Sequence, residues 1–433
     1  MSNTLLTISQ ITNEGLMVLE NDLCFADHVN RQYADQFALV GAKIGYTVNV
    51  RRPPRYIGTT GPALSIEDTN ETYTPVVLST QFHVDVQFTT ADMATSVDLF
   101  KERVLNPVIA RVANKIDQDG TVFAAQNIAN AVGTPGTALA STTPILTAGA
   151  ILDTQAAPRD GTRVLILGPY QHATMVAAVQ GLFNPQRLIS EFTEKGIIAK
   201  DFLGFDWYMD QNMYSQTIGA GGGTPALANN TSSAWLASGW ARNGLIQTSG
   251  WTAAAGARLN VGDVITVAGV YPVNPQSRLQ VGTNLQQFTV IPPQATLANG
   301  TYSNGTYSST AAGLLDLWVS GAGIYAGQFQ NVSAQPAANA AVTLWGNSTS
   351  TQYAGTVSTQ SIAMHRDCVA LAFADLDLPG GVDMAARAVD EEDGMSFRIV
   401  RQYTINNDAL PARCDVLYGY GMLYEELGCR VVA

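Results

Sequence analysis

The sequence predicts an α+β protein of more than one domain, in which a small antiparallel β-barrel interrupts a mixed α/β domain. The chain has 433 residues, more than the roughly 250–300 at which single hydrophobic cores usually stop growing. Near Thr90 the period of the apolar residues changes from 2 to 3.6, which indicates strands followed by a long helix. Beyond Ile218 the chain becomes rich in Gly, Thr and Asn with short apolar stretches, as in small antiparallel barrels.

A long hairpin is expected within residues 43–90, after an N-terminal arm over residues 1–42 that opens with a short helix. Apolar and polar residues alternate over 46–50 and again over 82–88, so both segments are predicted strands that pair with each other. The segment between them, RRPPRYIGTTGPALSIEDTNETYTP, has the composition of a loose tip. Because a two-stranded hairpin is marginal by itself in water, we expect it to project and to rest on a neighbouring copy.

A long amphipathic helix is expected over about residues 92–131, inside a peripheral domain of residues 91–137. Apolar residues recur there at steps of three and four. Pro107 and Gly120 should bend or interrupt this helix, and the sequence GTPGT should end it. The candidate hinge residues of this domain are Pro107, Gly120, Gly133, Pro135 and Gly136.

An axial α/β domain is expected over residues 138–222 and again over 347–433, where return strands of the peripheral domain also lie. Its markers are the apolar run RVLIL at 163–167, a helix near 171–180 and strands around 205–209. Between the two parts, LNVGDVITVAGVYPV, LQQFTVI and LLDLWVSGAG predict the inserted β-barrel of residues 223–346. The run GAGGG at 219–223 is expected to be a flexible linker that serves as a hinge.

Composition and charge exclude several classes of function. The net charge is −12 and only 13% of residues are charged, whereas a nucleic-acid groove needs clustered Lys and Arg. No apolar run approaches the roughly 20 residues of a membrane span, and the start of the chain lacks the pattern of a signal peptide. We therefore expect a cytoplasmic product without membrane contact, whose four cysteines are free thiols.

No signal for catalysis, a cofactor or a metal stands out. Serine-hydrolase, phosphate-loop, zinc-protease and dinucleotide motifs are absent from the sequence, and the four histidines lie in four separate segments. Asp117 and Asp119 before Gly120 hint at a calcium loop, but the remaining ligands are missing. We expect no catalytic residue, no cofactor and no metal.

One basic cluster lies on the predicted hairpin tip. Arg51, Arg52 and Arg55 are close together in an otherwise acidic chain. They are candidates for an inter-subunit contact with an acidic run such as residues 390–393 of a neighbouring copy. The alternative is a solvated tip, since exposed ion pairs contribute only about 0–1 kcal/mol each.

The order of these parts resembles that of a known family. Arm, long hairpin, long helix, α/β domain, inserted barrel and returning strands resemble the major coat proteins of tailed double-stranded DNA phages with the Hong Kong ninety-seven fold. The inserted barrel and segments such as RVLILGPYQHATM, FLGFDWYMDQNM and HRDCVALAFADLDLP resemble the coat protein family of Salmonella short-tailed temperate phages.

This resemblance implies an icosahedral head of hexamers and pentamers, built in the host cytoplasm as a scaffolded procapsid that expands on maturation. Implied partners are other copies of the chain, a scaffolding protein, a portal protein at one vertex and packaged DNA without sequence-specific contacts; a decoration protein is left open. Relatives that crosslink covalently need a Lys on the hairpin, and residues 51–75 contain none, so a noncovalent shell is expected.

Two other functions are compatible with part of the sequence. A secreted surface-layer or adhesin protein would share the low charge and the Thr- and Asn-rich barrel, but it needs an export signal. An α/β enzyme could use the edge of the strand over 163–167, where ligands often bind beyond strand ends. It would require a perturbed acid–base pair near Gly168.

Overall fold

The fold is known from a computed structural model that describes residues 23–32, 47–89, 106–179, 202–345, 353–389, 395–406 and 409–433. The predicted arm helix lies outside these residues. Few helices and many strands confirm the predicted α+β class. The chain divides into two compact units, each of which is described by itself. The first unit comprises Met1–Val50, Tyr73–Gly120 and Val369–Leu423, and the second comprises Arg51–Thr72, Thr121–Cys368 and Tyr424–Ala433.

The first unit is built on a five-stranded antiparallel sheet around the long strand β23 (Ala409–Met422). The other strands are β3 (Thr80–Thr89), β20 (Val369–Ala374), β21 (Met384–Val389) and β22 (Ser396–Arg401). Strand β3 has the predicted alternation, with residues 82, 84 and 86 half-buried and their neighbours exposed. It pairs with β23 over ten residues.

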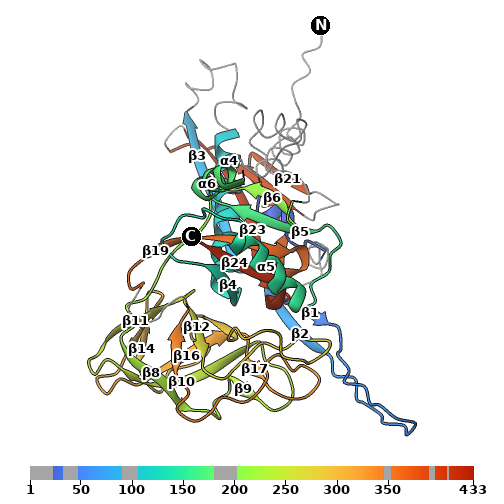
Figure 1. Cartoon of the computed structure of the whole chain (residues 1–433). Coiled ribbons are helices and arrows are strands. Elements are labelled where there is room, and N and C mark those ends of the chain that lie inside the picture. Colours follow the sequence, from blue (N-terminus) through green and yellow to red (C-terminus); the bar gives the residue numbers. More distant parts are fainter. Residues whose placement is uncertain are drawn as a thin grey trace. The chain divides into compact units, whose positions relative to one another are not determined.

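The pairing predicted for the hairpin is therefore wrong. Strand β1 (Thr47–Arg52) pairs with β2 (Thr72–Val77), while residues 82–88 belong to the sheet of β23. Alternation identifies a strand but does not name its partner. Strand β2 was missed because its sequence TYTPVV contains Pro75, which is typical of turns and edge strands. The projecting part of the hairpin is thus the loop of residues 53–71, between β1 and β2 (Figure 1).

Helix α4 (Asn106–Asn127) buries one apolar face that includes Ile109, Val112 and Ile116. Asp117 on the same helix accepts hydrogen bonds from the backbone N–H groups of Cys24 (2.7 Å) and Ala26 (2.9 Å), next to the 3-10 helix η1 (Ala26–His28). This carboxylate is therefore used to hold the N-terminal segment.

Helix α4 ends earlier than predicted. It stops at Asn127, and the following residues form strand β4 (Asn130–Gly133). The apolar run after Asn127 predicts a continuation of the helix. These residues instead form a strand, because β4 pairs in parallel with β24 (Gly428–Val432) at the end of the chain. Such a distant partner leaves no local signal in the sequence.

The second unit contains a mixed sheet in the order β4, β24, β19 (Val357–His365), β5 (Arg163–Leu167) and β6 (Asp206–Met209), with β7 (Ser215–Thr217) beside β19. All five residues of β5 are buried, as RVLIL predicts. Helices α5 (Thr143–Thr154) and α6 (Pro169–Val179) contribute apolar side chains to the core of this sheet. The 3-10 helices η3 (Arg366–Cys368) and η4 (Glu425–Leu427) follow β19 and precede β24.

A nearly closed antiparallel barrel lies in the same unit (Figure 1). Its strands run in the order β18 (Val342–Leu344), β12 (Val264–Val267), β13 (Gln287–Val290), β16 (Leu315–Ser320), β10 (Asn243–Trp251) and β8 (Gly223–Asn229). Smaller sheets are formed by β11 (Gly256–Asn260), β15 (Thr306–Ser309) and β14 (Thr301–Ser303), and by β9 (Trp235–Leu236) and β17 (Gly323–Ile324). A bridge between Ala226 and Ala341 joins the two end strands of the barrel.

The predicted flexible linker at GAGGG runs into a strand, because β8 begins at Gly223. The role of residues 219–222 as a hinge stays a prediction. Residues from Gly223 onward form β8, which pairs with β10 through two irregularities in register. A Cβ atom on Gly223, whose φ is +82°, would lie 2.4 Å from the carbonyl oxygen of Gly250. Glycine is needed here for close approach of two backbones.

The free edge of β4 is covered by the barrel. The side-chain amide of Gln287 accepts from the N–H of Ala131 at 2.6 Å and donates to its carbonyl at 2.9 Å. Thr289 also donates to the carbonyl of Ile128 at 2.8 Å. These contacts resemble the hydrogen bonds of a neighbouring strand, and they satisfy backbone groups that a free sheet edge would leave unpaired.

In the described part of the chain, no helix is long and apolar enough to span a membrane.

Candidate functional site

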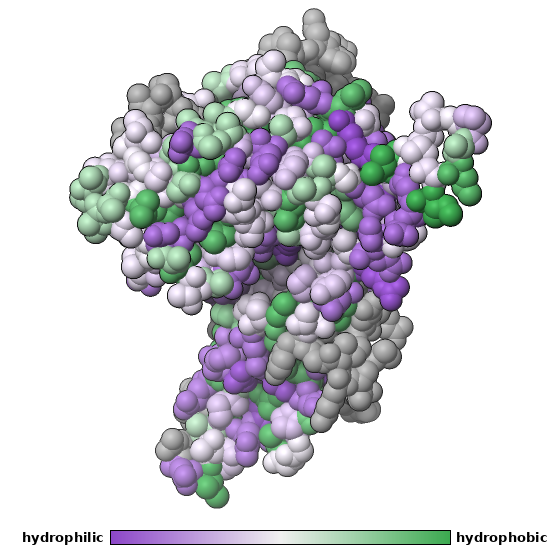
Figure 2. Space-filling model, turned by 90° about the horizontal axis from the view of Figure 1, so that it is seen from below, coloured by the Kyte–Doolittle hydropathy of each residue, from purple (hydrophilic) through white to green (hydrophobic). Residues whose placement is uncertain are grey.

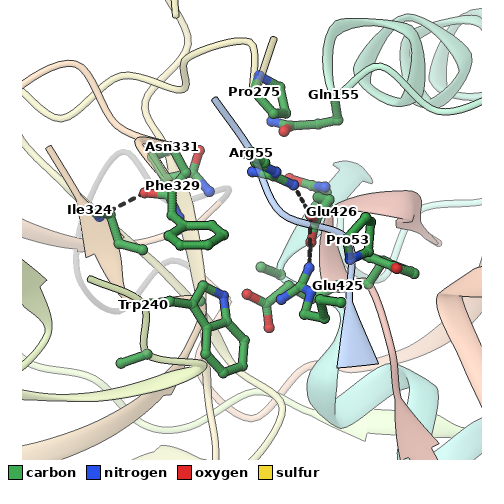
Figure 3. Close-up of a pocket in the computed structure, with 17 residues that line it drawn as sticks. Pro53, Arg55, Gln155, Trp240, Pro275, Ile324, Phe329, Asn331, Glu425 and Glu426 are labelled. Carbon is green, nitrogen blue, oxygen red and sulfur yellow. Dashed lines mark hydrogen bonds and ion pairs between the residues drawn. The ribbon is translucent and has the colours of Figure 1, made fainter. Parts of the chain in front are cut away.

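A cluster of charged side chains lies at the root of the projecting loop. Arg52, the last residue of β1, contacts both carboxylate oxygens of Glu426 at 2.9 and 3.1 Å through one nitrogen. Arg55 contacts the same carboxylate at 2.8 Å. Figure 3 shows the pair of Arg55 and Glu426, with the carboxylate of Glu425 beside them. Hydrogen bonds between such charged partners are about twice as strong as neutral ones.

Two aromatic rings complete the surroundings of Arg52. Its guanidinium lies 5.1 Å from the ring centre of Trp240 and 4.8 Å from that of Tyr424. The whole residue is only 8% exposed, so each cation–π contact acts in a partly desolvated place and is worth about 1–2 kcal/mol. We call the set that holds this arginine the socket; it consists of Arg52, Arg55, Trp240, Tyr424, Glu425 and Glu426.

The two carboxylates of the socket differ in their titration. Burial, with the neighbouring charge of Glu426, raises the pKa of Glu425 to about 7. Burial acts on Glu426 in the same direction, but Arg52 and Arg55 outweigh it and leave the pKa of Glu426 below its ordinary value. Glu426 is therefore the permanent counter-ion of the two arginines.

The cavity beside the socket is suited to holding the loop and not to binding a substrate. Its volume is about 70 Å³, far below the roughly 300–1,000 Å³ of small-molecule sites. A wider groove of about 920 Å³ runs between α5, β4 and residues 281–287. None of the residues that line this groove is ionisable, so it offers no acid or base for catalysis.

The edge of β5 offers little to an α/β enzyme. Asp210, which follows β6, is 3% exposed, and burial raises its pKa. One of its oxygens accepts from the N–H of Asn212 at 2.7 Å. The other has no hydrogen-bond partner within the described residues. The acid–base pair that this function requires is therefore not seen in the described part of the chain.

The three arginines predicted for an inter-subunit contact have separate environments. Arg52 and Arg55 are ion-paired inside their own chain, so the alternative of a solvated tip is wrong for Arg52. The Arg51 side chain is 82% exposed and lies 3.5 Å from Glu71. The acidic run at 390–393 lies outside the described residues. A contact of this cluster with a neighbouring copy stays a prediction.

Pro107 and Gly120 both lie in α4. Pro107 is the second residue of the helix, and the residues before Asn106 lie outside the described part. The helix continues without interruption through Gly120, so the expected break there is not found. The boundary between the two units nevertheless falls after Gly120. A hinge at either residue stays a prediction.

The other three hinge candidates lie at the end of β4. Gly133 has a φ of +98°, and a Cβ atom on it would lie 2.2 Å from the carbonyl oxygen of Val432. Pro135 and Gly136 are the central residues of a turn closed by the N–H of Thr137 on the carbonyl of Thr134 at 3.3 Å. The φ of +71° at Gly136 is typical of a type II turn. Their role as hinges stays a prediction as well.

Sequence reasoning found the arginines of the socket but missed its other members. Glu425 and Glu426 are more than 370 positions from Arg52, and Trp240 comes from the barrel. The one available signal was the pair of acidic residues in GYGMLYEELGCRVV, in a segment that is otherwise apolar and predicted to be strand. Two adjacent carboxylates in such a segment need cationic partners.

Comparison with solved structures gives distant likenesses to capsids. The chain is similar to a structure from Mycobacterium phage Che8, with 10% identity, 94% of this chain and 90% of that chain covered, and a TM-score of 0.44. A virus-like particle from Pyrococcus furiosus gives 6% identity, coverages of 98% and 97%, and a TM-score of 0.38. The mature capsid of bacteriophage PhiM1 gives 10% identity, coverages of 89% and 82%, and a TM-score of 0.36.

The family comparison is decisive for the assignment. No curated protein matches the chain. The family described as "P22 coat protein - gene protein 5" matches residues 1–431, almost the whole chain of 433 residues. This match confirms the resemblance drawn from the order of the parts and leaves the surface-layer alternative without support. The chain belongs to the P22 coat protein family, a family of structural capsid proteins.

Proposed function

We propose that this protein is the major capsid protein of a tailed phage and that it assembles with itself, as hexamers and pentamers, into an icosahedral head around double-stranded DNA. Assembly would take place in the host cytoplasm on a separate scaffolding protein, with a portal protein at one vertex and expansion of the shell on maturation. Membership of the coat protein family supports the structural role in the virion. The proposed boundaries of the arm, peripheral, axial and barrel domains are those predicted above.

The observation that carries self-assembly is the surface of the projecting loop. Leu64 is 89% exposed, Ile66 is 82% exposed, and Tyr56 and Ile57 are each about half exposed. Figure 2 shows hydrophobic residues gathered on this loop at the right edge of the molecule. Single exposed apolar residues are normal, but several on a projecting loop indicate a surface that another protein covers.

The loop is also held in a defined shape before it meets a partner. The carboxylate of Glu67 accepts from the N–H groups of Ile57 at 2.7 Å and Gly58 at 2.6 Å, which joins the two arms of the loop. The hydroxyls of Tyr56 and Thr69 are 3.0 Å apart. Such preorganisation lowers the entropy cost of binding. A second copy is the proposed partner, because many weak contacts repeated around a shell give a stable assembly.

This proposal predicts that charged residues at the loop tip block assembly without unfolding the chain. The double variant Leu64→Asp with Ile66→Asp should reduce the yield of closed particles at least about tenfold, because burying two unpaired carboxylates costs several kcal/mol. Electron microscopy and sedimentation of the purified product would measure the yield. The melting temperature should stay close to that of the wild type, since both side chains are exposed in the single chain.

The matched control adds the same charge to the same loop without removing an apolar side chain. Thr59 and Thr60 are both exposed, and the double variant Thr59→Asp with Thr60→Asp should leave the yield of particles close to normal. Normal assembly of the double variant would contradict the role of the loop tip. Equal loss of assembly in the control Thr59→Asp with Thr60→Asp would show that charge on the loop, and not the apolar surface, decides the outcome.

A further inference from the structure

The root of the loop is attached to the barrel by contacts that do not involve its tip. Arg278 donates to the carbonyl of Tyr56 at 2.6 Å. Gln328 donates to the carbonyl of Asp68 at 2.8 Å and accepts from the side chain of Asn70 at 2.7 Å. Both arms of the loop are therefore bound by barrel side chains, in addition to the contacts of Arg52 and Arg55.

The socket supplies the most buried of these attachments. The guanidinium of Arg52 contacts the rings of Trp240 in the barrel and of Tyr424, which precedes η4. The same guanidinium forms an ion pair with Glu426. Arg51, the residue before it, is exposed, and within the described residues its ion pair is the surface contact with Glu71. Two adjacent arginines on one strand thus differ in almost every contact, and only one of them joins the loop to the barrel.

Among the described residues, charged side chains from three elements face this point. The end of β1 contributes Arg52, the loop contributes Arg55, and η4 contributes Glu425 and Glu426. The barrel contributes Arg242, whose charge acts on Glu425. The uncharged hydroxyl of Ser320, also from the barrel, lies 3.3 Å from Glu425. This arrangement binds a cationic side chain of the same chain and is not a site for a free ligand, because Arg52 and Arg55 already contact the carboxylate of Glu426.

We infer that the inserted barrel and the turn at η4 together position the loop: by holding Arg52 in the socket, they set the direction in which the loop leaves the second unit. The inference rests on the proposed function only in that the loop is the same one that would meet a neighbouring copy. It assigns to the barrel a positioning role that depends on Trp240, Arg278 and Gln328.

A fixed root matters because errors in direction grow along the loop. The loop of residues 53–71 has about nine residues in each arm, which at about 3.3 Å per residue reach about 30 Å. A swing of about 10° at the root would move the tip by about 5 Å, which is about the spacing of neighbouring strands. Contacts with a neighbouring copy at the tip would be lost by such a displacement, since packed interfaces tolerate little misfit.

The test is a distance measurement in the unassembled, full-length chain. Spin labels would be placed on Leu64→Cys at the loop tip and Thr301→Cys on the barrel, both exposed positions, in a Cys24→Ser background because the other three cysteines are buried. Pulsed electron paramagnetic resonance gives the distribution of distances between the labels. We expect a single narrow distribution, and a broader or shifted one in Arg52→Met.

Two further variants keep the result interpretable. Arg51→Met removes the same charge from the neighbouring position and should leave the distribution narrow. Glu426→Gln removes the carboxylate charge that pairs with Arg52, and it should broaden the distance distribution as Arg52→Met does. Circular dichroism would show whether each variant is folded; if Arg52→Met is unfolded, Glu426→Gln carries the test.

The inference would be overturned if folded Arg52→Met and Glu426→Gln both gave the narrow distribution of the wild type, or if Arg51→Met broadened it equally. This failure can be told apart from failure of the proposed function. The distance distribution could broaden in unassembled Arg52→Met while unlabelled Arg52→Met forms closed particles in normal yield. This result would support the positioning of the loop by the socket and contradict the role of the loop in assembly.

Discussion

Asp263 and Arg430 are two buried residues of opposite charge in the second unit. Asp263, at the turn before β12, accepts from the N–H groups of Gly219 at 3.0 Å and Asn260 at 2.7 Å, and from the side chain of Gln216 at 3.1 Å. Arg430 on β24 donates to the carbonyl of Gly262 at 2.8 Å. These two residues connect the barrel to the mixed sheet, and both are almost fully buried.

The titration of Asp263 predicts a pH dependence of stability. Burial raises the pKa of Asp263 from 3.8 to about 6, against the three hydrogen bonds that it accepts. Below about pH 4 the carboxyl group is protonated in both the folded and the unfolded chain. Between about pH 4 and 6 the unfolded chain releases this proton while the folded chain retains it, so the folded state loses on the order of 3 kcal/mol.

Urea unfolding of wild type and Asp263→Asn between pH 4 and pH 7 would measure this contribution. The free energy of unfolding of the wild type should fall, relative to that of the variant, as the pH rises through this range. The difference should level off above about pH 7, where Asp263 is ionised in both states. A constant difference between the two proteins across the range would show that the pKa of Asp263 is not raised in the folded chain.

At the scale of single residues, the sequence predicts which side chains are unusual but not which of them meet. The cluster of Arg51, Arg52 and Arg55 stood out in an acidic chain. Its division into one exposed and two paired residues depends on Glu426, a partner from the far end of the chain. Long-range pairs of this kind arise from the sheet topology and leave no trace in local spacing.

Among the elements, helix α4 depends on a glycine for packing. A Cβ atom on Gly120 would lie 2.5 Å from a ring carbon of Phe25 and 2.7 Å from the hydroxyl of Tyr420. The Phe25 ring is fully buried, and that hydroxyl is bonded to the carbonyl of Ile116 at 2.9 Å. Neither group can move without losing contacts. Gly120 is therefore explained by the close approach of Phe25 and Tyr420 to the helix, which continues without interruption at this residue.

Gly120→Ala should therefore lower the free energy of unfolding. Overpacking of this kind costs about 1–3 kcal/mol, which exceeds the gain of up to about 1 kcal/mol from better helix propensity. Gly149 in α5 provides the matched control, because a Cβ atom there meets only Phe205, at an ordinary 3.5 Å. Gly149→Ala should raise the free energy of unfolding by about 0.5–1 kcal/mol. Chemical denaturation of both variants would measure the two effects; equal stabilisation would contradict the packing role of Gly120.

Elements with a strong local pattern were predicted well, and elements defined by distant partners were not. The buried strand β5, helix α6, the Gly-Asp turn before β12 and the alternation in β3 all lie where their patterns predict them. The partner of β1, the end of α4 and strand β8 were wrong, since each depends on pairing with residues far away in the sequence. Pro75 and the glycines near 223 are typical of loops. In the structure Pro75 lies in strand β2, and Gly223 lies where two strands approach each other closely.

For the whole molecule, order of the parts was more informative than any single motif. The sequence contains no catalytic signature, yet the succession of hairpin, helix, split α/β domain and barrel resembled a coat protein, and the family match over residues 1–431 confirms it. The net charge of −12 is compatible with the proposed enclosure of DNA without tight binding. The projecting loop supports the proposed self-assembly, because the apolar side chains at its tip are exposed to solvent in the single chain.

The most direct test of this account is electron microscopy of the purified full-length chain, expressed with and without the scaffolding protein of the same phage. We predict closed particles of uniform size in the presence of the scaffolding protein, with loops of neighbouring copies in contact. Monomers or open aggregates under both conditions and at every protein concentration would contradict the assignment of this chain as the building block of a capsid.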